Sequence, residues 1–221
     1  MNVAAAILAG GGGTRMGQGA GGTVKGLLSV GGDRIIDRQL AVLRPRFAEV
    51  LIAANDPDPW AGLGLRVIPD RAGRDASPSA STFGPIAGLD AILAALPSTI
   101  DAVVCVAGDM PFLAAAVLEH LRDGSPGAAA LIPRACGRAE PLLARYARVV
   151  APIVADQIVR GRYALVDLLA RLGAGVTWID EAELRTLDPD LRSIVNVNTP
   201  QDLAELADLF ELGAGDPPKE P

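Results

Sequence analysis

Short runs that are apolar at every position recur through the first half of the chain and predict buried strands. Such runs occupy residues 3–9, 50–54 and 102–107, and a further short strand, mostly apolar, is predicted at residues 65–68. Because they do not alternate between apolar and polar positions, we expect strands that are covered on both faces. Apolar residues at helix spacing fill residues 34–47 and 85–96. The resulting order of strand, helix, two strands, helix and strand indicates an α/β fold with a mainly parallel sheet between helices.

The second half of the chain has a less regular pattern. Helices are predicted at residues 113–121, 149–160 and 164–172, and strands at residues 128–133, 140–146 and 176–179. A short strand over residues 194–200 is expected to run into a last helix, with Thr199 as its N-cap and Pro200 as its first residue. Residues 213–221 are expected to form a flexible tail. Without a repeat or a linker, residues 1–212 are predicted to form one domain.

The composition excludes several classes of function. The net charge of −6 argues against a partner that is a nucleic acid or an anionic membrane. The chain shows no basic leader and no stretch of 18 apolar residues, so we expect a soluble, cytoplasmic protein. Cys105 and Cys136 form no metal-binding or disulfide pattern. The single histidine, His120, is expected at a helix end or on the surface, so catalysis by histidine is not predicted.

A glycine-rich segment follows the first predicted strand and carries the strongest chemical signal. Four consecutive glycines, residues 10–13, precede Thr14 and Arg15, and Lys25 follows ten residues after Arg15. Glycines allow backbone N–H groups to approach a ligand closely, and such amides bind anions. Two cations add positive charge beside them. The spacing matches neither the P-loop of nucleotide triphosphatases nor the dinucleotide fingerprint. The segment is interpreted as the seat of a nucleoside triphosphate.

Polar side chains also follow the other predicted strands. Asn55, Asp70 and Asp109 come directly after the runs that end near residues 54, 68 and 107. The carboxyl ends of parallel strands meet at one edge of the sheet, where ligands of such folds bind. We therefore expect these side chains and the glycine-rich segment to form one site.

Four segments then show a family resemblance. The sequences are LAGGGGTRMG at residues 8–17 with KGL at 25–27, GPIAGL at 84–89, GDMPF at 108–112 and NVNTPQDL at 196–203. The first resembles the signature of nucleotidyltransferases, and the whole set resembles the molybdenum-cofactor guanylyltransferases. The resemblance implies a three-layer, Rossmann-like nucleotidyltransferase fold with a mainly parallel twisted sheet. It divides the domain into a nucleotide-binding half, residues 1–112, and an acceptor-binding half, residues 113–212.

The resemblance also implies a reaction. Enzymes of this family transfer GMP from Mg-GTP to the phosphate of molybdopterin and release pyrophosphate. Mg²⁺ is the implied cofactor, and GTP and molybdopterin are the implied substrates. Proteins of molybdopterin biosynthesis and chaperones of molybdoenzymes are the partner proteins that such an activity suggests, and neither nucleic acid nor membrane is among them.

Roles for single residues follow from the same resemblance. Arg15, Lys25 and Asp109 are the expected catalytic residues, with Asp109 as the metal ligand and the two cations on the phosphates. GTP is expected to contact Leu8, Ala9, Gly10, Gly11, Gly12, Arg15, Lys25, Asn55, Asp70 and Asp109. Asn196 and Asn198 are expected to hold the metal or the acceptor phosphate. Gly10 replaces the alanine that is usual in related cytidylyltransferases, which favours guanine. Asp109 as a helix N-cap and Asp70 as a turn residue are the structural alternatives.

The chain also departs from the family pattern. Seven residues, 18–24, separate Gly17 from the lysine where about three are usual, and residues 71–83 are lengthened. Ala53 stands where an asparagine often contacts the nucleotide, and Asn55 is the expected substitute. Three alternatives stay open: cytidylyl transfer to molybdopterin, nucleotidyl transfer to a sugar phosphate, and a non-catalytic nucleotide-binding protein.

Overall fold

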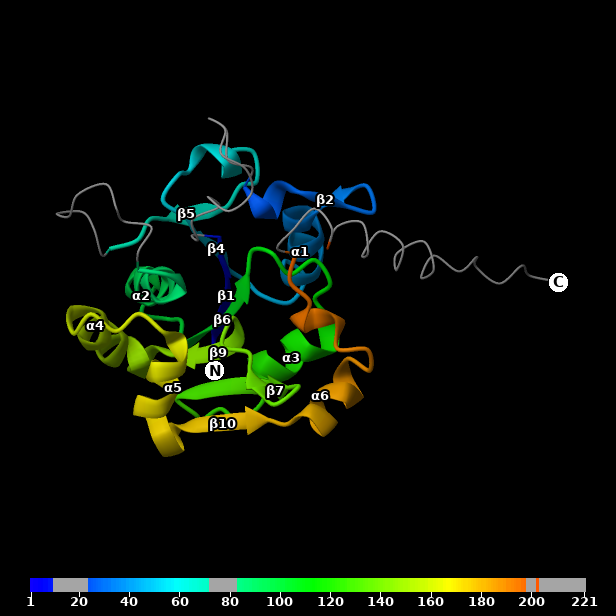
Figure 1. Cartoon of the computed structure of the whole chain (residues 1–221). Coiled ribbons are helices and arrows are strands. Elements are labelled where there is room, and N and C mark those ends of the chain that lie inside the picture. The colour runs from blue at the N-terminus through cyan, green and yellow to red at the C-terminus, as the bar shows by residue number, and fades with distance from the viewer. Residues whose placement is uncertain (10–23, 72–82, 198–201, 203–221) are drawn as a thin grey trace.

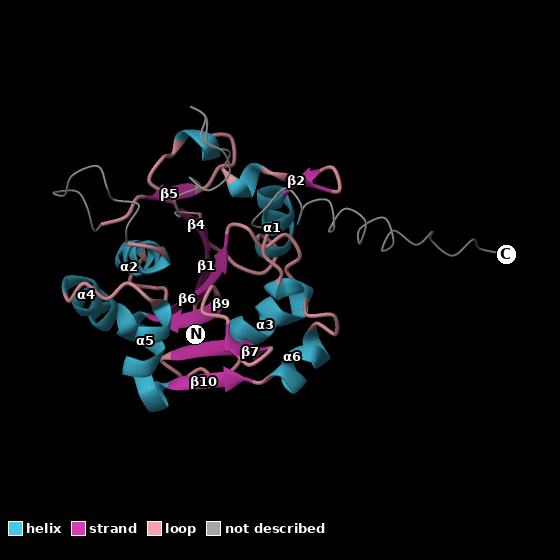
Figure 2. Ribbon diagram, viewed as in Figure 1, coloured by secondary structure: helices cyan, strands magenta, loops and turns pink. Residues whose placement is uncertain are grey.

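The computed structural model describes residues 1–9, 24–71, 83–197 and 202. In these residues one large sheet lies between two layers of helices (Figures 1 and 2). Its strands are β1 (Val3–Leu8), β4 (Val50–Ala53), β5 (Arg66–Ile68), β6 (Ala102–Ala107), β7 (Ala130–Ala135), β8 (Arg138–Ala139), β9 (Leu143–Ala147) and β10 (Val176–Ile179). Their order is β10-β7-β9-β6-β1-β4-β5, with β8 paired to β7. The three-layer α/β architecture that the sequence predicts is confirmed.

The sheet is parallel except around β9 and at β8, which runs antiparallel to β7. Strand β1 pairs in parallel with β4 and β6, β4 with β5, and β7 with β10. Strand β9 runs antiparallel to both of its neighbours, β6 and β7. Every residue of β1 and β6 is buried, because helices cover both faces of these central strands. This explains why their sequences are continuous apolar runs rather than alternating patterns.

In the described part of the chain, three helices cover each face of the sheet. The helices α1 (Ile35–Leu43), α3 (Ala115–Asp123) and α6 (Glu181–Leu187) lie on one face, and α2 (Pro85–Ala95), α4 (Ala151–Val159) and α5 (Leu165–Leu172) on the other. Ile7 belongs to the first core and its neighbour Ala6 to the second. Successive residues of a strand point to opposite faces, so one short segment serves both cores.

The expected strand at residues 194–200 is wrong over its described part. A 3-10 helix covers Arg192–Ile194, and residues 195–197 belong to no strand. The backbone N–H of Val197 donates to the Asp109 carbonyl (2.9 Å) instead of to a neighbouring strand. Thr199, Pro200 and residues 213–221 lie outside the described residues, and residue 202 is helical.

Helix α6 and two hairpins were not predicted. The side chain of Asp180 accepts a hydrogen bond from the backbone N–H of Glu183 (2.8 Å), so Asp180 caps α6. The Asp-x-x-Glu pattern at this point is a start signal for a helix. The strands β2 (Ser29–Val30) and β3 (Asp33–Arg34) form a separate antiparallel hairpin, and β7 and β8 form the other. Among the described residues, no helix is long and apolar enough to cross a membrane.

Candidate active site

The site lies where four parallel strands end at the same level. The register places Leu8 opposite both Ala53 and Ala107, and Ala53 opposite Ile68. Residues that follow these positions therefore emerge side by side at the carboxyl edge of the sheet. Ala9, Asn55, Asp70 and Asp109 are such residues. The structure therefore shows the expected convergence of Asn55, Asp70 and Asp109 at the end of β1.

Two glycines bring the segments of the edge close together. The Gly108 N–H donates to the Leu8 carbonyl (3.1 Å), and a Cβ at Gly108 would lie 3.3 Å from the Ala9 Cα. A Cβ at Gly26 would lie 3.1 Å from the Trp60 ring and 3.3 Å from the Gly108 carbonyl oxygen. Both contacts are tighter than a side chain usually allows. Glycine at these positions therefore lets the lysine-bearing turn and the end of β6 pack against β1.

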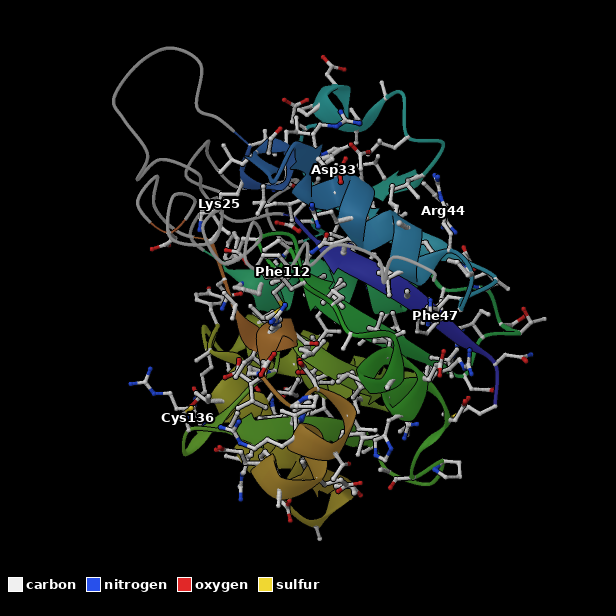
Figure 3. The ribbon with its side chains drawn as sticks, turned by 90° about the vertical axis from the view of Figure 1, so that its right-hand side faces the viewer. Lys25, Asp33, Arg44, Phe47, Phe112 and Cys136 are labelled. Carbon is white, nitrogen blue, oxygen red and sulfur yellow. The ribbon has the colours of Figure 1, made fainter. Side chains whose placement is uncertain are left out.

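The central charges of the site are Lys25 and Asp109. Lys25 begins a 3-10 helix, Lys25–Leu27, and its Nζ lies 3.1 Å from Oδ2 of Asp109. The two side chains are 31% and 20% exposed, so both are open to a ligand. Figure 3 shows Lys25 at the side of the molecule where the described chain resumes after residues 10–23. The expected catalytic lysine and aspartate are therefore direct neighbours.

Hydrogen bonds from Gln39 and Val197 hold the backbone around Asp109. Gln39 of α1 is buried, and its Nε2 donates to the carbonyls of Ala107 (2.7 Å) and Met110 (2.9 Å). The Val197 N–H donates to the carbonyl of Asp109 itself. Sequence reasoning missed Gln39, although a glutamine inside the apolar stripe of a helix is an available signal. These bonds fix the direction in which the Asp109 side chain leaves the sheet.

The carboxylate of Asp109 suits a hard cation. Helix α3 begins at Ala115 with Ala114 as its N-cap residue, so Asp109 does not cap it. Mg²⁺ is bound by one or two carboxylates together with substrate phosphates and waters. The described residues contain no group of three or more His, Cys, Asp or Glu side chains that could hold a metal without such help. Asp109 therefore fits a cation that is shared with phosphate groups.

Asn55 and Asp70 form a second polar pair at the ends of β4 and β5. The Asn55 Nδ2 donates to Oδ2 of Asp70 (3.0 Å), and the Asp70 N–H donates to Oδ1 of Asn55 (2.9 Å). The other oxygen of Asp70, Oδ1, is buried and has no hydrogen-bond partner among the described residues. Burial raises the pKa of Asp70, the bond from Asn55 opposes this, and the nearby carboxylate of Asp90 adds to it.

Ala53 and Gly88 pack closely beside the Asn55–Asp70 pair. Ala53 is fully buried, and a Cβ at Gly88 would lie 3.2 Å from the Ala53 Cβ. Helix α2 therefore packs directly on the position where the family pattern has an asparagine. Asp90 and Arg71 complete this flank, with Nη1 of Arg71 3.7 Å from Oδ2 of Asp90. Burial raises the pKa of Asp90 and Arg71 lowers it.

The remaining predicted site residues fall partly inside and partly outside the described residues. Leu8 and Ala9 lie at the edge as described, and exposed Asn196 precedes the Val197 that binds Asp109. Gly10, Gly11, Gly12, Arg15 and Asn198 lie outside the described residues. Their roles stay predictions, as does the role of each placed residue.

The histidine and the cysteines take no part in this site. His120 lies in α3 with Nε2 3.2 Å from Oε1 of Glu183, at the far end of that helix from Asp109. Cys105 is buried in β6, and burial raises the pKa of its thiol far above its usual value. Cys136 is exposed on the β7–β8 turn. The expectation of a surface or helix-end histidine is confirmed.

A parallel α/β sheet with a lysine–aspartate pair at its carboxyl edge, next to a strand that leads into consecutive glycines, defines a nucleotide-dependent transferase of the nucleotidyltransferase class. The comparison with known families agrees, because the model of the MobA-like NTP transferase domain matches residues 5–177. The chain belongs to this family.

Similar proteins cover nearly the whole chain. A molybdenum cofactor guanylyltransferase from Rhodobacter capsulatus is 35% identical over 97% of this chain and 100% of its own length. A probable molybdenum cofactor guanylyltransferase from Methanosarcina mazei is 33% identical over 91% of this chain and 88% of its own length. The crystal structure of molybdopterin-guanine dinucleotide biosynthesis protein A from Archaeoglobus fulgidus is 29% identical, with a TM-score of 0.75 over 95% of this chain and 99% of that chain.

Proposed function

We propose that this protein transfers GMP from Mg-GTP to the terminal phosphate of molybdopterin and releases pyrophosphate. The observation that carries the proposal is the Lys25–Asp109 pair at the carboxyl edge, directly beside the strand that leads into the glycines. The names of the relatives that align along nearly the whole chain support the nucleotide and the acceptor.

The reaction needs positioning and charge neutralisation more than covalent help from the protein. An oxygen of the acceptor phosphate attacks the α-phosphorus of GTP, and a new P–O–P bond forms. The bond between the α-phosphorus and its bridging oxygen to the β-phosphate breaks, and the electron pair leaves with pyrophosphate. Negative charge concentrates on the triphosphate during this step, so fixed cations and oriented N–H groups stabilise it.

The residues of the edge fit these tasks. Asp109 would hold Mg²⁺, which supplies electrostatic neutralisation of the phosphate oxygens when it is bound. Lys25, whose Nζ lies 3.1 Å from the Asp109 carboxylate, would donate hydrogen bonds to oxygens of the same triphosphate. Arg15 and the backbone N–H groups of Gly11 and Gly12 would hold the leaving pyrophosphate.

Asn55 and Asp70 would hold the nucleoside at the other end of the nucleotide. Their mutual hydrogen bonds fix both side chains, and Oδ1 of Asp70 is left as an acceptor. The space at Gly10, which has no methyl group, would admit guanine. Leu8 and Ala9 complete this wall at the end of β1.

The finer surroundings of the reaction are proposals too. We place the reaction in the cytoplasm and expect the product to pass to proteins that assemble or insert the molybdenum cofactor. Mg²⁺, rather than another divalent ion, is proposed because one carboxylate together with phosphates and waters is its usual set of ligands in proteins.

Pyrophosphate release with each nucleotide tests this function. The protein is incubated with molybdopterin, Mg²⁺ and GTP, CTP, ATP or UTP in turn. We expect release with GTP at a rate at least tenfold above the others. Release with CTP that equals or exceeds that with GTP would identify a cytidylyltransferase. No release with any nucleotide would favour a non-catalytic nucleotide-binding protein.

A further inference from the structure

The β7–β8 hairpin belongs to the part of the sheet that lies on the other side of β6 from β1, β4 and β5. Through β9, the register sets Ala130 level with Val103 and Leu131 level with Val104. Counting onward, Pro133 is level with Val106 and Ala135 with Gly108. The carboxyl end of β7 therefore reaches the same edge as the carboxyl end of β6.

Strand β8 and Glu140 fill the space between these two ends. The Ala129 carbonyl accepts from the Ala147 N–H at the end of β9, and every second carbonyl along β7, including that of Pro133, faces the same side. Strand β8 therefore pairs with β7 on the side of β9, beyond the start of β9. The Glu140 N–H donates to the Pro133 carbonyl (2.9 Å), and the Leu143 N–H donates to the Glu140 carbonyl (3.0 Å). Neighbouring strands lie about 5 Å apart. The backbone of Glu140 is thus one strand spacing from Pro133, which is level with Val106 near the end of β6, and Leu143 pairs with Val106 itself.

Arg138 and Glu140 point to the face of the sheet that α1, α3 and α6 cover. Segment 195–197, whose Val197 N–H donates to the Asp109 carbonyl, lies on the same face. Arg138 pairs with Ala135, which belongs to the core under α1, α3 and α6. Opposed residues of an antiparallel pair share a face, and Glu140 lies two residues further along the same side. In Figure 3, Lys25, Phe112 and Cys136 follow one another along one side of the molecule, with Cys136 marking the turn of this hairpin.

Among the described residues, the carboxylate of Glu140 has no partner that explains its position. Glu140 is half-buried, and no side chain of the described residues lies at hydrogen-bond or ion-pair distance from its carboxylate. Burial raises its pKa, and the charge of Arg138 opposes that shift. A partly desolvated carboxylate that is kept charged without hydrogen bonds costs free energy. A ligand that donates hydrogen bonds would remove this cost.

We propose that the β7–β8 hairpin is the subsite for the pterin ring of the acceptor, with the Glu140 carboxylate accepting the paired N–H donors of its 2-amino-4-oxopyrimidine edge. This assignment rests on the proposed function for the identity of the acceptor. A ring N–H and an adjacent amino group match the two oxygens of a carboxylate, as in other bidentate pairs. The charge of Arg138 favours the ionised form of Glu140.

This placement gives the two substrates opposite flanks of Asp109. Across the edge, β5 and β4 carry Asp70 and Asn55, then come β1 and β6, and then the hairpin. A nucleotide that extends from Asn55 to Lys25 and a pterin that extends from Glu140 would meet at Asp109. The acceptor phosphate could therefore approach the α-phosphorus from the side opposite to the leaving pyrophosphate.

Glu140→Gln tests the subsite, and binding of 6-hydroxymethylpterin, a pterin without a phosphate, gives a readout apart from turnover. Binding is measured with Mg²⁺ and a non-hydrolysable GTP analogue present. We expect Glu140→Gln to weaken binding at least tenfold and Glu140→Asp to give an intermediate value. Arg134→Gln is the matched control, because Arg134 lies on the same hairpin but on the opposite face, over the Trp178 ring at 3.6 Å. It should bind the pterin like the wild type.

Turnover separates this proposal from the proposed function. Glu140→Gln should raise the KM for molybdopterin at least tenfold and leave the KM for GTP within twofold. Equal pterin binding by wild type and Glu140→Gln, or an equal rise in both KM values, would overturn the subsite. Wild-type turnover of molybdopterin without any pterin binding would also overturn the subsite while the function stands. Pterin binding that is lost in Glu140→Gln, without turnover of molybdopterin by the wild type, would support the subsite and contradict the function.

Discussion

At the scale of single residues, the site combines a few charges with unusually constrained surroundings. Asp109 and Lys25 lie 3.1 Å apart, so in the proposed reaction both would reach the same phosphate region of the nucleotide. Gln39 and Val197 fix the backbone on either side of the carboxylate. Substitution of the side chain alone should therefore change the chemistry without changing the fold.

Asp109→Asn is expected to lower kcat for pyrophosphate release at least 100-fold. The amide keeps the size of the side chain but loses the charge that holds Mg²⁺. Thermal unfolding should stay within about 2 °C of the wild type, because the Lys25–Asp109 pair is partly exposed and adds little stability. Asp123→Asn, in an exposed ion pair with Arg122, is the control and should keep full turnover. Wild-type turnover by Asp109→Asn would exclude Asp109 from the metal site.

Asp70→Asn is expected to raise stability and weaken GTP binding. Burial raises the pKa of Asp70 above the ordinary value of 3.8, so the folded protein holds this proton more tightly than the unfolded chain. Ionised Asp70 therefore costs stability above its folded pKa, and the cost disappears as the pH falls toward 3.8. Asparagine removes the cost.

The measurement for Asp70→Asn is thermal unfolding at two pH values, with and without Mg-GTP. Without nucleotide, Tm should rise by about 2 °C at pH 7.5, and the gain should shrink near pH 4.5. With Mg-GTP, the upward shift of Tm should be smaller than in the wild type. A fall of Tm at pH 7.5 would show that the Asn55 hydrogen bonds outweigh the cost of burial.

At the scale of elements, one buried arginine joins the sheet to the end of a helix. Arg145 of β9 is fully buried, and its guanidinium donates to the carbonyls of Leu121 (3.1 Å) and Ser125 (2.5 Å) and to that of Gly124. These carbonyls stand at the C-terminal end of α3, where helical partners are missing. A cation there also complements the helix dipole.

Arg145→Met is expected to lower the free energy of unfolding by about 3 kcal/mol, because several buried carbonyls lose their donors at once. Chemical denaturation measures the loss. Arg122→Met is the matched control on α3, where the guanidinium is partly exposed and pairs with Asp123; it should cost less than about 1 kcal/mol. Equal losses in the two variants would show that Arg145 does not hold the end of α3.

The elements also show which strands and helices a sequence pattern can predict. Strands such as β1 and β6 were predictable because burial on both faces requires an apolar residue at every position. The strand expected at 194–200 failed because apolar Val195 and Val197 pack in a small cluster with Phe112, next to Asp109, without a neighbouring strand. Local composition does not reveal that a segment lacks a ladder partner. The capping pattern at Asp180 was readable and would have located α6.

At the scale of the whole molecule, the topology gathers distant segments at one edge. Residues near 9, 25, 55, 70 and 109 meet there because four parallel strands end at the same level. Such a convergence is predictable from strand order alone. The position of the β7–β8 hairpin, on which the proposed pterin subsite rests, was not predictable, because it depends on β9 running antiparallel and on the register through it.

The family assignment also concerns the molecule as a whole. The matched model spans residues 5–177, which include both the nucleotide flank and the hairpin. The net charge of −6 means that the polyanionic substrates meet an acidic protein, so local cations and a divalent metal must supply the attraction. This is consistent with a site in which Asp109 serves a cation and Lys25 serves phosphate.

Identification of the reaction product is the most direct test of the central claim, that GTP and molybdopterin react at this edge. The wild-type protein is incubated with Mg²⁺, GTP and molybdopterin, and the products are identified by mass spectrometry while pyrophosphate is measured. The account predicts a molybdopterin–GMP adduct in equal amount to the pyrophosphate released, and neither product without the acceptor. Pyrophosphate without the adduct, or an adduct that carries CMP in preference when CTP competes, would contradict it.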